Sequence, residues 1–169
     1  DALARYLDKL IRAVPIESKF IKQLADHLNA EVVGGTVTNI SEAVTWLMYT
    51  YLHVRMLRNP IAYGISADQK DADPMLRERS EELIVEAAKL LDQNKMLRYN
   101  TRTGNLAMTN LGRVAAHFYV QAESVATFND TLDSGRSLSD GELMLLICCA
   151  TEFENVQVRQ QELDEVDSL

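Results

Sequence analysis

An abrupt change of hydrophobic period at residues 96–109 constrains the fold more than any other feature of this chain. Before residue 95 and after residue 110, apolar residues recur at the three- and four-residue spacing of amphipathic helices. Between them, the stretches 96–99 and 106–109 flank a six-residue segment that contains Gly104, and this arrangement is typical of a β-hairpin. A single hairpin among amphipathic helices predicts a fold that is mainly α.

The order of the elements narrows the fold class. We expect a helix capped at Ser18, a very short strand within 32–38, a helix from Asn39 to just before Pro60, and an ordered loop over 59–72. The pair Asp73-Pro74 is a helix-start signal, which predicts a third helix over 73–94, directly before the hairpin. This is the order of a winged helix, with the hairpin as its wing. Helical spacing over 111–132 predicts a further helix, Ser139 with Glu142 forms a capping box that predicts the start of another, and the tail over 160–169 is expected to be a short acidic helix. The winged helix is therefore expected to be followed by the start of a helical bundle.

Charge is divided unevenly along the chain. The formal net charge is −8, from 17 Lys and Arg against 25 Asp and Glu, and the excess negative charge lies in the last 49 residues. This balance excludes a protein that coats nucleic acid generally, because such affinity comes from neutralising phosphates. The third helix, 73–94, carries six acidic residues against three basic ones, so we expect that it does not read duplex DNA.

The wing has the opposite charge. Lys95, Arg98 and Arg102 are basic, and neither Asp nor Glu occurs from residue 93 through residue 122. These three basic residues are the candidate contacts to a nucleic-acid backbone. The alternative is a solvated hairpin whose exposed charges contribute little.

The histidines and cysteines of the sequence do not form a pattern that is typical of a catalytic or metal-binding site. His27, His53 and His117 are far apart in the sequence, which favours surface or core histidines over metal ligands. Cys148 and Cys149 are neighbours on an expected helix and point in different directions, so we expect one of them in the core and no catalytic thiol pair. The sequence has no phosphate-binding loop with its Lys and Ser/Thr, and no apolar run of membrane-spanning length. We therefore assign no catalytic, cofactor-binding or metal residue.

Four aromatic residues gather in the second helix and the loop after it, namely Trp46, Tyr49, Tyr51 and Tyr63. A platform for stacking bases is one interpretation. A packed core or a domain interface is the other, and the bulk of these side chains favours it.

Several short motifs carry a resemblance that covers nearly the whole chain. They are Pro-Ile-Glu-Ser at 15–18, Leu-Asn-Ala-Glu at 28–31, Gly-Thr-Val-Thr-Asn at 35–39, Trp-Leu and Tyr-Thr-Tyr-Leu within 46–52, Asn-Pro and Tyr-Gly-Ile-Ser within 59–66, and Leu-Gly-Arg with His-Phe-Tyr within 111–119. With these motifs in this order, the chain resembles the large two-cassette Ski-like superfamily 2 helicases, and among their segments it resembles the first cassette.

The resemblance implies a division of the chain. In that family two RecA-like domains hydrolyse ATP and move 3′ to 5′ along a strand, and a winged helix and a helical bundle follow them. Residues 1–14 would then be the last helix of a RecA-like motor domain, residues 15–109 the winged helix, and residues 110–169 the start of a Sec63-like helical bundle. ATP and magnesium would belong to the motor of the parent protein, and none to this segment.

The resemblance also implies a function. We expect a non-catalytic scaffold that couples the motor domains to the bundle around a single strand of RNA or DNA. Its expected partners are the other domains of the same parent chain and the subunits of a larger complex, in the nucleus or the cytosol and not at a membrane. The alternative is a stand-alone winged-helix module that binds DNA or another protein.

Overall fold

The computed structural model describes residues 2–12, 15–132, 135, 137–157 and 159–163. Its α-helices are α1 Ala2–Ile11, α2 Leu24–Val33, α3 Ile40–Met48, α4 Tyr51–Arg58, α5 Ala67–Ala72, α6 Arg77–Gln93, α7 Asn110–Phe118, α8 Ala122–Leu132 and α9 Asp140–Cys148. The strands are β1 Leu97–Tyr99 and β2 Leu106–Met108, and short 3₁₀ helices lie at Phe20–Gln23, Pro60–Tyr63, Thr151–Phe153 and Gln160–Glu162. The prediction of a mainly α fold with one hairpin is confirmed.

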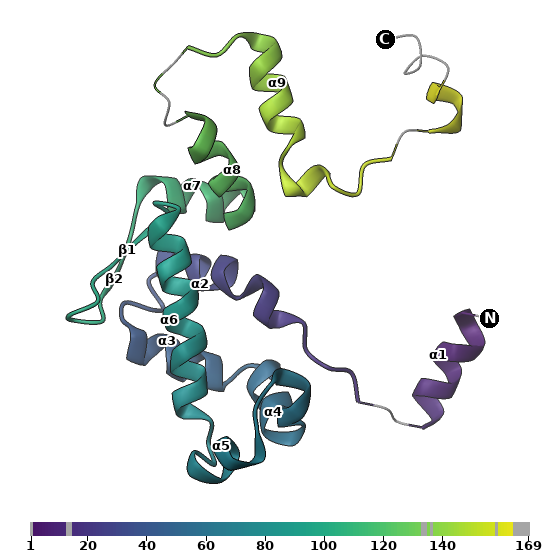
Figure 1. Ribbon diagram of the computed structural model, residues 1–169, viewed down its shortest axis with the longest axis vertical. Helices are drawn as coiled ribbons and strands as arrows, with labels where there is room; N and C mark the ends of the chain where they lie inside the picture. Colours follow the sequence, from purple (N-terminus) through teal and green to yellow (C-terminus); the bar gives the residue numbers. More distant parts are fainter. Residues whose placement is uncertain (1, 13–14, 133–134, 136, 158, 164–169) are drawn as a thin grey trace.

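A three-helix core organises the winged helix. The long helix α6 packs against both α2 and α3, and α2 also packs against α7 (Figure 1). Leu28, Leu47, Ile84 and Leu91 are fully buried where these helices meet. Burial of such aliphatic side chains is the main favourable contribution to folding. The wing leaves the C-terminal end of α6, so the core determines where the hairpin stands.

The wing is a two-stranded antiparallel hairpin in which Leu97 pairs with Met108 and Tyr99 with Leu106. The short strand expected within 32–38 is absent from that described segment, because α2 continues to Val33 and Gly35 then turns the chain with a φ of +76°. A single bridge between Asn39 and Asn105 takes its place, and the Thr38 carbonyl accepts a 2.8 Å hydrogen bond from the Leu106 N–H. The wing is therefore tied to the start of α3 by only a few backbone hydrogen bonds.

The helix expected from Asn39 to Pro60 is two helices. It does begin at Asn39, whose Oδ1 accepts from the Glu42 N–H, but α3 ends at Met48. Thr50 is extended, and its side-chain oxygen accepts from the His53 N–H, which caps a new helix, α4. A Thr that hydrogen-bonds backbone groups favours such a helix start over a helix interior. The change of direction turns α4 toward the first half of α6.

The loop expected over 59–72 contains a 3₁₀ turn and the short helix α5, which begins with a capping box at Ser66. The expected start of the third helix at Asp73-Pro74 is four residues too early. Leu76 has a left-handed conformation, with φ +50°, and its side chain is 1% exposed. Burial of Leu76 in the core thus sets the start of α6 at Arg77, and Asp73 caps it by accepting from the Glu78 N–H.

The helix expected over 111–132 is also interrupted. Tyr119 has a φ of +58° and ends α7, and α8 begins at Ala122. The capping box expected at Ser139 with Glu142 is confirmed and starts α9. In the tail, residues 160–162 form a 3₁₀ turn, and the rest of the acidic helix expected over 160–169 lies mostly outside the described residues.

Candidate nucleic-acid interface

The three basic residues of the wing lie at different positions along the hairpin. Lys95 lies where the chain leaves α6 and has a φ of +60°, Arg98 lies in β1, and Arg102 lies in the loop at the tip. The tip is held by Asn100, whose Oδ1 accepts from the N–H groups of Arg102 and Thr103 at 3.0 and 3.2 Å. Lys95, Arg98 and Arg102 are all exposed, so each can reach a ligand in solution.

Alternation along the strand explains the placement of Arg98. Leu97 is 1% exposed and faces the core, so Arg98, the next residue, faces away from it. Arg98 lines a hollow of about 300 Å³ where the wing ends and α7 begins, together with Met108, Thr109, Asn110 and Arg113. Lys95 and Arg102 do not line this hollow. The residue that joins Arg98 there is Arg113 of α7, which sequence reasoning missed because it lies outside the wing.

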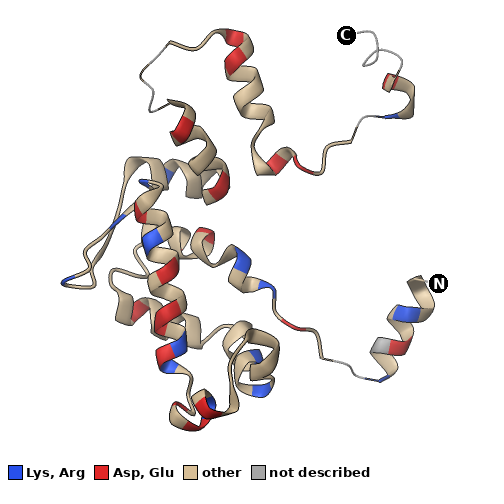
Figure 2. Ribbon diagram, in the orientation of Figure 1, with Lys and Arg blue, Asp and Glu red and all other residues tan. Residues whose placement is uncertain are grey.

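Figure 2 shows the separation of charge between the wing and α6: blue segments follow the hairpin and α7, while red segments recur along α6. Arg79 on α6 is already paired with Glu82, at 2.8 Å. A duplex that seats α6 in its groove would place phosphates beside these carboxylates. The geometry therefore favours the wing over α6 as the surface for a phosphate backbone.

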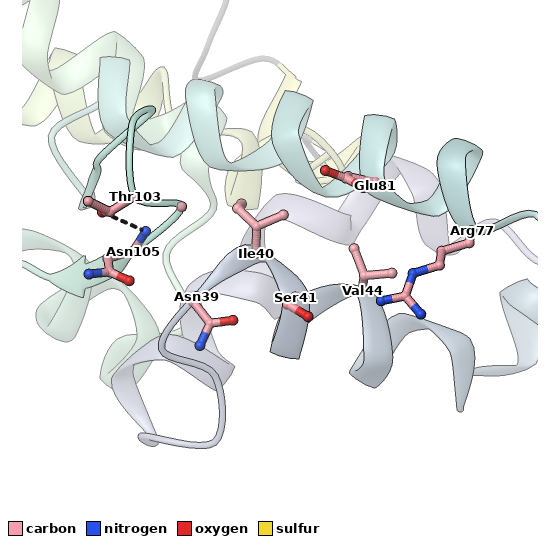
Figure 3. Close-up of a pocket in the computed structure, with 9 residues that line it drawn as sticks. Asn39, Ile40, Ser41, Val44, Arg77, Glu81, Thr103 and Asn105 are labelled. Carbon is pink, nitrogen blue, oxygen red and sulfur yellow. Dashed lines mark hydrogen bonds between the residues drawn. The ribbon is translucent and has the colours of Figure 1, made fainter.

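A second hollow, of about 470 Å³, lies between the start of α3, the tip of the wing and α6. Figure 3 shows Arg77 and Glu81 on its α6 wall, and Thr103 and Asn105 on its wing wall. The wing wall is held by a 3.3 Å hydrogen bond from the Asn105 N–H to Thr103 Oγ1. One basic and one acidic side chain line this hollow, so its lining has no net positive charge that would attract an anion.

The aromatic zone serves packing at two of its four residues. Trp46 is partly buried against the core and lies 6.0 Å from the Phe20 ring, and Tyr63 is partly buried against the same core. Tyr51 is 55% exposed and donates to the Ile16 carbonyl, whereas Tyr49 is 88% exposed. Packing in the core therefore holds for Trp46 and Tyr63 and not for Tyr49 and Tyr51, and for these two a domain interface stays a prediction.

Glu17 is the centre of a polar cluster that sequence reasoning missed. Its carboxylate accepts from Arg55, Asn59 and Tyr63, at distances between 2.7 and 3.2 Å. The hydrogen bonds from Arg55 and Asn59 lower the pKa of Glu17 to about 2. Burial, together with the hydrogen bond to Glu17, raises the pKa of the Tyr63 phenol. The cluster joins the segment before the first 3₁₀ helix to α4, and it is a structural ion pair rather than a reactive site.

The histidines and cysteines form no reactive group in the described ranges. The His27 ring stacks on Phe20, His53 is buried beside Ser80, and His117 meets Phe118 edge to face. Cys148 and Cys149 are both exposed, so the expectation that one lies in the core is wrong. The reason is that α9 contacts α8 but little else among the described residues. No group of three metal-ligating side chains occurs in the described part of the chain.

Two known domain families match separate parts of the chain. The winged helix-turn-helix domain family matches residues 17–93, and the Sec63 Brl domain family matches residues 108–169. The chain is 47% identical over its full length to activating signal cointegrator 1 complex subunit 3 of Dictyostelium discoideum and 44% identical to that of Homo sapiens. It is 48% identical over its full length to the DExH-box ATP-dependent RNA helicase DExH14 of Arabidopsis thaliana.

Over its full length the chain matches Ski-like superfamily 2 helicases. It spans 8% of the length of each of these three relatives. The segment between the two matched domains, 94–107, contains most of the wing. Among the residues that the structure describes, no helix is long and apolar enough to cross a membrane.

Proposed function

We propose that this chain is the non-catalytic winged-helix and scaffold segment of an ATP-dependent 3′–5′ helicase, and that it couples the motor domains to the helical bundle around a single strand. The observation that carries the proposal is the division of charge between a basic wing and an acidic α6. A winged helix that reads duplex DNA needs positive charge on the helix that enters the groove. This chain has its positive charge on the hairpin instead.

We divide the chain into the end of a RecA-like motor domain at 1–14, a winged helix at 15–109 and the start of a Sec63-like bundle at 110–169. Helix α1 supports the first boundary, because Leu3, Leu7 and Leu10 are exposed along it and its apolar face has no counterpart in the described winged helix. The matched domain families support the division between the winged helix and the bundle. By the resemblance to helicases, ATP and magnesium would act in the motor of the parent protein.

Contacts at α8 support a coupling role. Asp26 of α2 accepts from the Ala122 N–H at 2.7 Å, and Asn94, at the end of α6, donates to the Ala122 carbonyl at 3.0 Å. Asn129 of α8 donates back to the Asn94 carbonyl at 2.8 Å. These hydrogen bonds hold the first bundle helices on two helices of the winged helix, so movement of one unit is transmitted to the other.

The partners we propose are the remaining domains of the same chain, a single strand of RNA or DNA, and other subunits of a complex in the nucleus or the cytosol. Lys95, Arg98 and Arg102 are the proposed contacts to the backbone of that strand. The contact is weak, because three exposed charges release few counterions. The remaining candidate function is a stand-alone module that binds duplex DNA through α6.

One experiment separates the two functions. The purified chain is titrated with fluorescent single-stranded and duplex oligonucleotides at rising salt, and ATP hydrolysis is measured with and without the single strand. We expect no hydrolysis and weak, sequence-independent binding that Arg98→Glu with Arg102→Glu abolishes. Sequence-selective duplex binding that depends on Arg77 and Arg79 would establish the stand-alone module instead. Phosphate release stimulated by nucleic acid would refute the non-catalytic assignment.

A further inference from the structure

Two arginines from different structural elements share one hollow at the base of the wing. Arg98 comes from β1, and Arg113 comes from the first turns of α7. The hollow is also lined by Thr109 and Asn110, where the wing ends and α7 begins. Two arginines that line one space of about 300 Å³ form an arrangement suited to an anion, because a guanidinium group can donate two parallel hydrogen bonds to a phosphate.

No described ion pair neutralises these two charges, although the Asp92 carboxylate of α6 lies beside β1, where its Oδ1 accepts from the Tyr99 N–H at 3.1 Å. The sequence has neither Asp nor Glu between residues 93 and 122. None of the ion pairs in the described ranges involves Arg98 or Arg113. Arg113 Nη2 donates to Asn110 Oδ1 at 3.2 Å, which is a bond to a neutral amide that orients the guanidinium and leaves its charge uncompensated. Like charges that line one hollow repel each other, and a bound anion removes that repulsion.

The start of α7 adds a favourable field. Thr109 caps this nine-residue helix by accepting from the Gly112 N–H at 3.0 Å, and its first turn contains no acidic residue. The positive end of the helix dipole therefore faces the same hollow as the two arginines. Thr109 Oγ1 also donates toward the Lys95 and Met96 carbonyls at 2.7 Å, which anchors the start of α7 to the base of the wing. The parts of the hollow are thus held together before any ligand arrives.

We propose that this hollow, here named the wing-base site (Arg98, Thr109, Asn110 and Arg113), binds a backbone phosphate of single-stranded nucleic acid. The proposal rests on the function proposed above and deepens it, because it places the main contact at the base of the wing and adds Arg113. Arg102 lies at the tip and contributes charge at a distance, without lining the site. Met108, which is 53% exposed, lies at the same hollow and offers an apolar surface to a sugar or a base.

The test measures binding of the 169-residue chain to a fluorescent single-stranded oligonucleotide as salt is raised. The test variant is Arg113→Glu, and the matched control is Arg58→Glu, which makes the same change of charge at an exposed residue of α4, away from the wing (Figure 1). We expect Arg113→Glu to weaken binding about tenfold and to lower the slope of log affinity against log salt by about 0.7, the value for one phosphate contact on a single strand. We expect Arg58→Glu to change affinity less than about twofold. The variant Arg113→Lys, which keeps the charge but loses the planar fork, should fall between wild type and Arg113→Glu.

Two outcomes separate this proposal from the function it rests on. If Arg98→Glu with Arg102→Glu abolishes binding while Arg113→Glu behaves like Arg58→Glu, the wing-base site is refuted and the wing contact stands. If the wild-type chain binds no single strand, both are refuted. Poly-glutamate that displaces the oligonucleotide at equal charge concentration would overturn the nucleic-acid ligand in favour of an acidic protein segment. Melting curves check that Arg113→Glu is folded, and Arg113→Gln replaces it in the same titration if it is not.

Discussion

Glu17 and Arg55 are joined by a two-pronged ion pair, although 38 positions separate them in the sequence. Arg55 Nη2 lies 2.8 Å from Glu17 Oε1, and Arg55 Nε lies 3.2 Å from Glu17 Oε2. Arg55 is only 7% exposed, so its charge needs this partner in the folded state. The pair fastens the start of the winged helix to α4.

Glu17→Gln should lower the melting temperature at pH 7 by several degrees, because it leaves the buried Arg55 without its counter-ion. The pKa of Glu17 falls from 4.5 to about 2 on folding, so its contribution to stability is complete above about pH 4.5 and is lost as the pH falls toward 2. Melting temperatures of wild type and Glu17→Gln between pH 2 and 7 should therefore converge at the acidic end. Curves that remain parallel over this range would contradict the assignment of the low pKa to Glu17.

His53 should make the fold sensitive to mild acid. It is 3% exposed, its Nδ1 lies 3.5 Å from Ser80 Oγ, and its Nε2 has no hydrogen-bond partner in the described structure. Burial lowers the pKa of His53 below 6.5, and the nearby Asp73 only partly opposes this. Because the unfolded chain then binds a proton that the folded chain does not, stability should fall as the pH drops below about 6.5.

Urea unfolding at pH 7 and pH 5.5 checks this expectation for His53. In His53→Leu the loss of stability between the two pH values should be smaller than in wild type. The exposed His117 provides the control, and His117→Gln should keep the pH dependence of the wild type. If both variants lose it equally, His53 is not the group responsible.

Gly112→Ala should be among the most damaging single-methyl additions in the chain. A Cβ at Gly112 would lie 1.8 Å from the Met96 carbonyl oxygen and 2.7 Å from Asn29 Oδ1. The clash would separate α7 from α2 and from the base of the wing, at a cost of about 3 kcal/mol. Gly141→Ala in α9 is the matched control, because a Cβ there meets nothing within 4 Å. Alanine favours the helix, so the control should be stabilised by up to about 1 kcal/mol in thermal or urea unfolding.

Substitutions at Asp26 should separate the stabilising effect of its hydrogen bond with the Ala122 N–H from the effect of its charge. Burial raises the pKa of Asp26 above 3.8, and the hydrogen bond from the Ala122 N–H opposes that shift. Asp26→Ala, which leaves the N–H at the start of α8 unpaired, should cost about 1 kcal/mol. Asp26→Asn keeps an acceptor and removes the partly buried charge, so it should cost less.

The sign of the pH effect at Asp26 is opposite to that at Glu17. Since folding raises the pKa of Asp26, the charged carboxylate costs stability above its folded pKa, and this cost is relieved as the pH falls toward 4. Urea unfolding at pH 7 and pH 4 should therefore show wild type gaining stability relative to Asp26→Asn at the lower pH, whereas the difference between Asp26→Asn and Asp26→Ala, neither of which titrates at this position, should not change. Glu123→Ala, at an exposed residue in the first turn of α8, controls for the loss of negative charge alone and should cost only about 0.3 kcal/mol.

Local signals in the sequence predicted the hairpin and the helix starts at Asn39 and Ser139. Each depends on residues within a few positions, such as the change of period at 96–109 or the pairing of Ser139 with Glu142, and the structure confirms all three. The distribution of charge could also be predicted, because the basic wing and the acidic 73–94 segment follow directly from the residue composition. The motifs that resemble helicases were sufficient to identify the family.

Tertiary contacts decided the rest. The helical pattern is interrupted at Thr50 and at Tyr119, and α6 begins only at Arg77. The later start leaves Leu76 in the core, with a left-handed backbone conformation. Such choices depend on what each side chain meets across the fold, which spacing along the sequence does not encode. For the same reason Arg98 and Arg113, 15 positions apart, come to line one hollow because α7 and the second strand of the wing both pack against α2. The sequence by itself determined the hairpin, the helix starts at Asn39 and Ser139, the charges and the resemblance to helicases, while packing determined where helices turn and which charges meet.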